Sequence, residues 1–218
     1  MSGLREKNRA DRDRRIVEAA AALFRQSGYE GAKIEAIAAT AGVSIGTIYN
    51  YYRNKGDLLV AIVSMEVDEV LNAGRALVAE PPHDVGAALD TLIGIYIEHS
   101  LHYLSKEMWR QAMAISTQQP DSPFGRTYTS LDHALAGQLC ALIEKLQALG
   151  RVRRSADAGS LGELIFNNMN MMFIEFVKDE PQTIAALRAA IVRQNRVLVA
   201  AIAAEPDPAP AAVPRIRW

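Results

Sequence analysis

Residues 43–59 hold the side chains of this sequence that are best suited to contacting a polar partner. The stretch VSIGTIYNYYRNKGDLL carries three tyrosines, two asparagines and a threonine, and in its first ten residues only Val43 and Ile48 are apolar positions that suit a core. Tyrosine, asparagine and threonine donate and accept hydrogen bonds, and lysine adds a positive charge. This composition is unusual for a core helix and indicates a segment that recognises another molecule.

Catalytic chemistry has no comparable signature. The sequence contains no glycine-rich phosphate-binding loop, no nucleophile elbow and no HExxH motif. His99 and His102 are three residues apart, but nothing in the sequence fixes their distance to His133 or Cys140, so no metal site is predicted. An enzyme is therefore the least supported interpretation, and no cofactor is expected.

The elements that position residues 43–59 are short helices joined by a sharp turn. Residues 34–41 place apolar side chains at i, i+3, i+4 and i+7, which is one face of a helix that stops at Gly42. Glycine readily adopts the positive φ of a helix C-terminus, and the Ser44 hydroxyl can cap the helix that follows. The pattern predicts a helix-turn-helix. A core-facing stripe in residues 16–24 predicts a further helix before it, ending at Ser27-Gly28.

These residues also carry a family resemblance. The sequence reads, in order, G-Y from Gly28, I-x-x-I-A from Ile34, and A-G-V-S-x-G-T-I-Y-x-Y-Y-x-N-K-x-D-L-L from Ala41. Over about residues 10–63 it resembles the DNA-binding head of the tetracycline-repressor (TetR) family of bacterial transcription regulators. The resemblance implies an all-α protein, with the head followed by a larger helical domain that binds a ligand and dimerises. One departure is Lys33, where the family usually has a threonine or serine cap, because an ammonium cannot accept a hydrogen bond.

The resemblance also implies which residues touch DNA. Base edges are expected to meet Ile45, Gly46, Thr47 and Asn50, and the sugar-phosphate backbone to meet Ser44, Tyr49, Tyr51 and Lys55. The residue types agree, since asparagine can bond an adenine edge and lysine a phosphate. Lys33 can reach a phosphate itself. Tyr52 is expected to be a packing residue, and packing is the alternative role for Tyr51.

The charge distribution agrees with a DNA-binding end. Residues 1–56 hold ten lysines and arginines and six acids, a net charge of +4, which leaves −5 for the remainder of a chain of net charge −1. Within it, residues 4–15 form a basic arm that is either a frayed helix start or a contact to phosphates or the minor groove. There is no signal peptide and no apolar run of the roughly 20 residues that span a bilayer, so a cytoplasmic protein is expected. The lone Cys140 agrees with a reducing compartment.

Three segments are expected along the chain. They are a helix-turn-helix domain with its basic arm over residues 1–56, a ligand-binding and dimerisation domain over residues 57–205, and a Pro/Ala-rich, disordered or loosely docked tail over residues 206–218. A fourth helix from Asn54 to residue 79 should span from the head into the body as a lever. Helices of the body are expected over residues 84–103, 106–116, 126–149, 157–178 and 182–204.

The last two helices predict the oligomeric state. Each has more apolar surface than one neighbour would cover, so they are expected to pair with their symmetry mates as a four-helix homodimer interface. A monomeric core pair of helices is the alternative.

A ligand site in the body is suggested by polar interruptions of an apolar helix. Asparagines at 167, 168 and 170 need partners, and apolar or aromatic residues elsewhere can line a cavity beside them. The expected ligand residues are Tyr96, Trp109, Met113, Asn167, Asn170 and Phe173, with Met169 beside them. Hydrogen bonds across the dimer interface are an equally good explanation for the asparagines, and ordinary core packing for the others.

Taken together, these features predict a transcription regulator, most simply a repressor. It should bind a palindromic operator in double-stranded DNA as a homodimer and leave it when an unidentified small-molecule inducer binds the body. The alternative is an architectural DNA-binding protein that needs no ligand and has little sequence preference.

Overall fold

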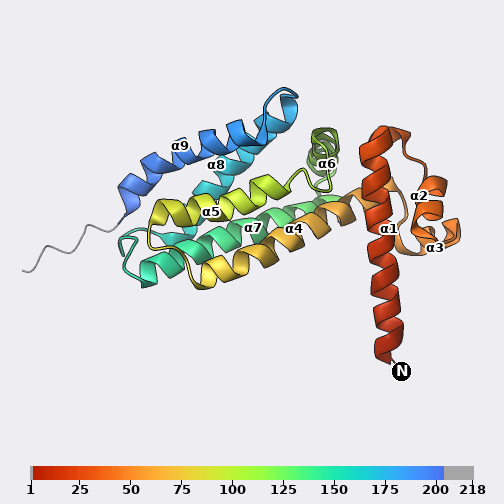
Figure 1. The fold of residues 1–218 in the computed structure, drawn as a ribbon, viewed down its shortest axis with the longest axis horizontal. Helices are drawn as coiled ribbons and strands as arrows, with labels where there is room; N and C mark the ends of the chain where they lie inside the picture. The colour runs from red at the N-terminus through yellow and green to blue at the C-terminus, as the bar shows by residue number, and fades with distance from the viewer. Residues whose placement is uncertain (1, 204–218) are drawn as a thin grey trace, which may run out of the picture.

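The structure is a computed structural model that describes residues 2–203, and within this range the regular secondary structure is helical (Figure 1). The prediction of an all-α fold is confirmed. The predicted tail over residues 206–218 lies outside the described residues. The helices are α1 (Ser2–Gly31), α2 (Ile34–Ala41), α3 (Ile45–Tyr51), α4 (Lys55–Ala79), α5 (Val85–His99), α6 (Lys106–Gln118), α7 (Pro123–Ala148), α8 (Ala158–Lys178) and α9 (Ile184–Ile202).

The head consists of α1, α2 and α3, which lie at one end of the molecule (Figure 1). The basic arm forms the N-terminal part of α1, and the regular helix is interrupted at Gly28, whose φ of 73° is in the region that favours glycine. The three helices share a small core that includes Phe24, Ile37 and Ile48, each 1% exposed or less. A core of this size is marginal alone, so the head depends on α4 for stability.

Helix α4 joins the head to the body. Asn54 caps it by accepting a hydrogen bond from the backbone N–H of Asp57 at 2.9 Å, as predicted. Its 25 residues span about 37 Å at 1.5 Å per residue. The first turns bury Leu58 and Leu59, and later turns bury Val67 and Val70 within the body. Figure 1 shows α4 running without a break from beside α1 to the far end of the body.

The body is a bundle in which α8 and α9 lie over α4, α5 and α7 (Figure 1). Helices α7 and α8 pack closely, and α4 packs against α7 on the other side. Helix α6 lies where the body meets α1. The close approach of α7 and α8 occurs at Gly162, where a Cβ would lie 2.5 Å from the backbone nitrogen of Cys140.

Two of the predicted boundaries in the body were wrong. Helix α7 begins at Pro123 rather than residue 126, because Ser122 caps the Gly125 N–H at 3.0 Å and proline is tolerated in a first helical turn. Helix α5 ends at His99, and the residues up to Leu104 form a turn instead of continuing the helix. Within the described residues, no helix combines the length and the apolar character needed to cross a membrane.

The packing of α7 against α8 leads to a testable difference between two glycines. Gly162→Ala should lower the free energy of unfolding by about 1–3 kcal/mol, because its methyl group overlaps the backbone of Cys140. Gly137→Ala, in the exposed interior of α7 with nothing within 4 Å of the added carbon, should raise stability by about 0.5–1 kcal/mol. Urea denaturation of the two variants measures both effects. Equal effects on stability would show that the α7–α8 contact is looser than described.

Candidate DNA interface and ligand cavity

Helix α3 presents most of the predicted base-contacting residues to solvent. Ser44 caps it by accepting from the Thr47 N–H at 3.1 Å, which confirms the predicted cap. Ile45 and Tyr49 are 41% and 54% exposed, although both have large apolar surfaces. Asn50 and Gly46 are also exposed, whereas Thr47 is half-buried and its hydroxyl lies 2.8 Å from that of Ser44. Exposed apolar and amide groups on one short helix are suited to contacting base edges.

The N-terminal part of α1 is fixed against the end of α3. The Tyr52 hydroxyl donates to Asp13 at 2.6 Å, and burial together with this bond raises the pKa of Tyr52. Tyr51 is half-buried, stacks on Tyr52, and has the Arg9 guanidinium 5.7 Å from its ring centre. Tyr52 is therefore a packing residue, as predicted. The basic arm and the end of α3 are therefore held together by side-chain contacts.

The two predicted phosphate lysines have different surroundings. Lys33 is exposed and stands at the N-cap of α2 without capping it, as predicted. The Lys55 ammonium donates to the carbonyls of Tyr29 and Glu30 at 3.0 and 2.9 Å, and it lies 5.1 Å from the centre of the Tyr29 ring. Lys55 thus ties α4 to the end of α1, so a contact to phosphate would come in addition to a structural role.

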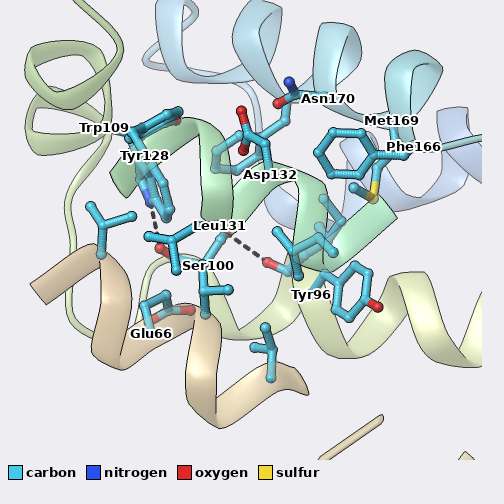
Figure 2. A pocket seen from close by; sticks show the side chains of 16 residues that line it. Glu66, Tyr96, Ser100, Trp109, Tyr128, Leu131, Asp132, Phe166, Met169 and Asn170 are labelled. Carbon is cyan, nitrogen blue, oxygen red and sulfur yellow. Dashed lines mark hydrogen bonds between the residues drawn. The ribbon is translucent and has the colours of Figure 1, made fainter. Parts of the chain in front are cut away.

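A cavity of about 60 Å³ lies inside the body, between α4, α5, α6, α7 and α8 (Figure 2). Four of the six predicted ligand residues line it, and so does Met169. The four are Tyr96, Trp109, Asn170 and Phe173. The Trp109 ring meets Phe173 edge-on at 5.3 Å, and its Nε1 donates to the Ser100 carbonyl at 2.6 Å. The walls of the cavity are mainly aromatic and aliphatic.

The other two predicted ligand residues, Met113 and Asn167, are not among those lining this cavity. Asn167 is exposed, because it lies about 100° around α8 from Phe166, beside the stripe that faces the cavity and outside it. Met113 is only partly buried, against the general core. Helical periodicity alone could not place either residue, because the side of α6 or α8 that points toward the cavity is set by how these helices pack against their neighbours.

Sequence reasoning missed two acids in the cavity wall, Glu66 and Asp132. Glu66 offered a signal, because it occupies the inward stripe of α4 together with Val63, Val67 and Val70. An acid in such a stripe is unusual and points to a specific partner. Figure 2 shows Glu66 on the α4 side of the cavity, with Asp132 and Asn170 toward α8.

Glu66 is the most strongly buried charged group of the cavity wall. Its side chain is 3% exposed, and its Oε1 lies 2.7 Å from Nδ1 of His99. The other ring nitrogen of His99 lies 3.3 Å from Glu69, which also accepts a hydrogen bond from the Tyr103 hydroxyl. Desolvation raises the pKa of Glu66 to about 7, against the opposing effect of His99, and desolvation likewise raises the pKa of Asp132 to about 6. The second oxygen of Glu66, Oε2, has no hydrogen-bond partner in the described chain.

The head and the wall of the cavity are joined by further contacts. The Arg25 guanidinium on α1 donates to the carbonyl of His102, and the Tyr29 N–H lies 3.5 Å from a carboxylate oxygen of Glu107 on α6. Helix α4 belongs to both parts, since it packs on α1 of the head and also lines the cavity of the body. Helix α4 is therefore a continuous connection between the cavity wall and the head.

An exposed helix-turn-helix on a helical body with an internal cavity defines the class of DNA-binding proteins that carry a helical regulatory domain. A family profile described as bacterial regulatory proteins of the tetR family matches residues 16–62. HTH-type transcriptional regulator BetI of Pseudomonas fluorescens is 31% identical over 150 residues, which cover 66% of this chain and 74% of BetI. The chain belongs to the TetR family of bacterial regulatory proteins.

Two further similarities cover different lengths of the chain. HTH-type transcriptional repressor KstR of Rhodococcus jostii is 35% identical over 65 residues, so this chain spans about a third of that relative, with a coverage of 30% of this chain and 31% of KstR. The crystal structure of Thermus thermophilus FadR, a TetR-family repressor in complex with lauroyl-CoA, has a TM-score of 0.66 at 22% identity and covers 91% of this chain and 98% of FadR. The second similarity shows a shared fold along nearly the whole chain.

The contrast between the two lysines gives a test of the DNA interface. Lys33→Ala should leave the melting temperature unchanged and should reduce the slope of log affinity against log salt by about 1, as expected for one lost phosphate contact. Lys55→Ala should lower affinity and also destabilise the protein by about 1.5–3 kcal/mol, because two carbonyls lose a charged donor. Salt titration by fluorescence anisotropy, with thermal melts of both variants, separates the two effects. An unchanged salt slope for Lys33→Ala would remove this residue from the interface.

Proposed function

We propose that this protein is a sequence-specific DNA-binding repressor that leaves its operator when a small molecule binds the cavity in its body. The observation that carries the proposal is the sharing of α4: this helix packs against α1 of the head, and its later turns form one wall of the cavity. Residues 1–56 are the DNA-binding domain in this proposal, and residues 57–205 the ligand-binding and dimerisation domain. Acting on chromosomal DNA, it would work in the bacterial cytoplasm.

The small size of the cavity suggests how ligand binding would release the protein from its operator. About 60 Å³ holds on the order of four water molecules, which is less than a metabolite of ten or more heavy atoms requires. A ligand of that size must therefore displace helices, and α4 is one of those that line the cavity. The ligand then favours a body in which α4 has moved, and the heads no longer have the spacing that the operator requires.

The relatives support the repressor assignment. KstR and FadR are described as repressors, and FadR was crystallised with lauroyl-CoA, a small-molecule ligand. An architectural DNA-binding protein, the alternative, would have no use for polar groups buried beside an internal cavity. The acids Glu66 and Asp132 in the cavity wall therefore favour a ligand-responsive regulator.

The proposed dimer forms through α8 and α9. Leu164 and Met171 of α8 are 54% and 57% exposed, and Val197 of α9 is 75% exposed, so each of the two helices has a large apolar side chain that an interface can cover. Asn167 lies on the same face of α8 as Leu164 and Met171, at i+3 and i−4, so a hydrogen bond across the interface is its proposed role. A homodimer presents two recognition helices to adjacent turns of a palindromic operator.

Operator selection tests the proposed function. Purified protein should enrich an inverted repeat from a random duplex pool, with half-site centres about 10 base pairs apart or a multiple of this spacing. Asn50→Ala should relax the preference at one base pair per half-site, at a cost of about 1–3 kcal/mol for the preferred base. Lys33→Ala is the comparison, since loss of a phosphate contact should weaken every sequence equally. Salt-sensitive binding without enrichment would favour the architectural protein instead.

The dimer interface can be tested with charge substitutions. Met171→Glu and Val197→Glu should each weaken dimerisation by about a hundredfold, because a buried unpaired carboxylate is expensive in an apolar interface. Leu149→Glu is the matched control, because Leu149 is 45% exposed at the end of α7 and outside the proposed face. Sedimentation equilibrium measures the dissociation constants. Monomeric wild-type protein at tens of micromolar would contradict the interface.

A further inference from the structure

We infer that the cavity takes a small organic cation with an apolar skeleton, such as an organic ammonium or a comparable protonated amine. Its positive group is held by the carboxylates of Glu66 and Asp132. The inference rests on the proposed function, because it names the class of ligand that would act as the inducer. It also goes beyond that function, since neither the repressor role nor the fold determines the charge of the ligand.

The unsatisfied oxygen of Glu66 is the first observation. Oε1 of this side chain is occupied by His99, whereas Oε2 has no hydrogen-bond partner in the described chain, and the residue lines the cavity. A carboxylate oxygen that is buried without a donor costs free energy, so the site is completed by a ligand that supplies a donor. An acid accepts hydrogen bonds when ionised, and a protonated amine supplies both the donor and the compensating charge.

The charges of the wall are the second observation. Two of the described residues lining the cavity are acids, and none is a lysine or an arginine. His99 touches Glu66 from α5, but it is not among the residues that line the cavity. An anionic ligand would therefore meet two carboxylates without a cation in the wall to compensate its charge.

The aromatic residues are the third observation. Five aromatic rings line the cavity, and they belong to Tyr96, Trp109, Tyr128, Phe166 and Phe173. Aromatic faces attract cations, and Trp does so most strongly, so these rings suit both the apolar body of the ligand and its positive group. An acyl chain alone would fill the apolar space but would leave the Glu66 oxygen without a donor.

The same acid connects the ligand to the helix that supports the head. Glu66 is on α4, and its bonded partner His99 is the last residue of α5. His99 also contacts Glu69, one turn further along α4, and Glu69 accepts from Tyr103 in the turn before α6. An ammonium group that draws the Glu66 carboxylate toward the cavity centre competes with this network and thereby loosens α4 from α5.

Matched ligands test the charge preference directly. We would titrate wild-type protein with amine, alcohol and carboxylate versions of three skeletons, 4-phenylbutyl, 2-naphthylethyl and n-decyl, and follow intrinsic tryptophan fluorescence together with thermal melts. The amine of at least one skeleton should bind ten-fold or more tightly than its alcohol, and the carboxylate should bind most weakly. Equal or tighter binding of the carboxylates, or no stabilisation by any amine, would overturn the inference.

Variants then locate the charge. Glu66→Gln and Asp132→Asn should each reduce amine affinity by about ten-fold while leaving the affinity for the alcohol nearly unchanged. Glu69→Gln is the matched control: Glu69 lies one turn from Glu66 and contacts the same histidine, but it is not among the cavity-lining residues. If Glu69→Gln weakens the amine as much as Glu66→Gln does, the effect comes from the network and the inference fails.

The pH dependence gives an independent readout. The amine needs ionised carboxylates, so its affinity should increase about ten-fold between pH 6 and pH 8, as the Glu66 carboxyl with its pKa of about 7 loses its proton. The charged and titratable neighbours are His99, Glu69 and Tyr103 around Glu66, and His133 and Tyr128 around Asp132. In Glu66→Gln most of this dependence should disappear, and a slope that persists unchanged would count against the assignment.

The outcome separates this inference from the proposed function. Release of the selected operator by a carboxylate or an alcohol of the set would keep the ligand-responsive repressor and reject the cationic ligand. Tight amine binding that depends on Glu66 but leaves operator affinity unchanged would keep the ligand class and reject the mechanism of release.

Discussion

The continuity of α4 is the constraint on which the rest of the structure depends. The head has only a small core, and it is completed by Leu58 and Leu59 at the start of this helix. One to three turns later the same helix forms a wall of the cavity through Val63, Glu66 and Val70. A straight helix cannot absorb a displacement within a few turns without breaking hydrogen bonds, so the two ends must respond together. The head and the cavity wall are therefore connected through the backbone of a single helix.

In the proposed mechanism, Glu66 is the group through which a small molecule controls this coupling. An acid with an unsatisfied oxygen in an apolar wall destabilises the body relative to one with a leucine at the same place. That destabilisation is removed when a ligand supplies the missing donor. The free energy that a ligand can use to shift the conformational equilibrium is its differential affinity for the two states, and a polar group satisfied only in the bound state contributes to this difference.

The head could be predicted almost completely from the sequence, whereas the cavity could not. Gly42, Ser44 and Asn54 act through contacts within three or four residues of themselves, so their roles follow from local rules. Helices of the body were also predicted, with errors only where a proline starts a helix or a turn ends one. The cavity depends on which faces of α6, α7 and α8 meet, and this is set by packing over long sequence separations. For that reason the cavity includes the predicted ligand residues Trp109 and Asn170 but not Met113 or Asn167, and Asp132 gave no signal at all.

In the proposed mechanism a ligand releases the operator whichever way it moves the heads. The helices around the cavity leave about 60 Å³, Lys55 at the start of α4 bonds to the Tyr29 carbonyl at the end of α1, and Arg25 bonds to the His102 carbonyl. A dimer with its heads fixed in this way has one spacing between its recognition helices, and an operator can be matched to that spacing alone. In the proposed symmetric dimer, a ligand large enough to push α4 outward would change the spacing of both heads at once. Since the matched spacing is the one that DNA selects, a change in either direction lowers the affinity for the operator.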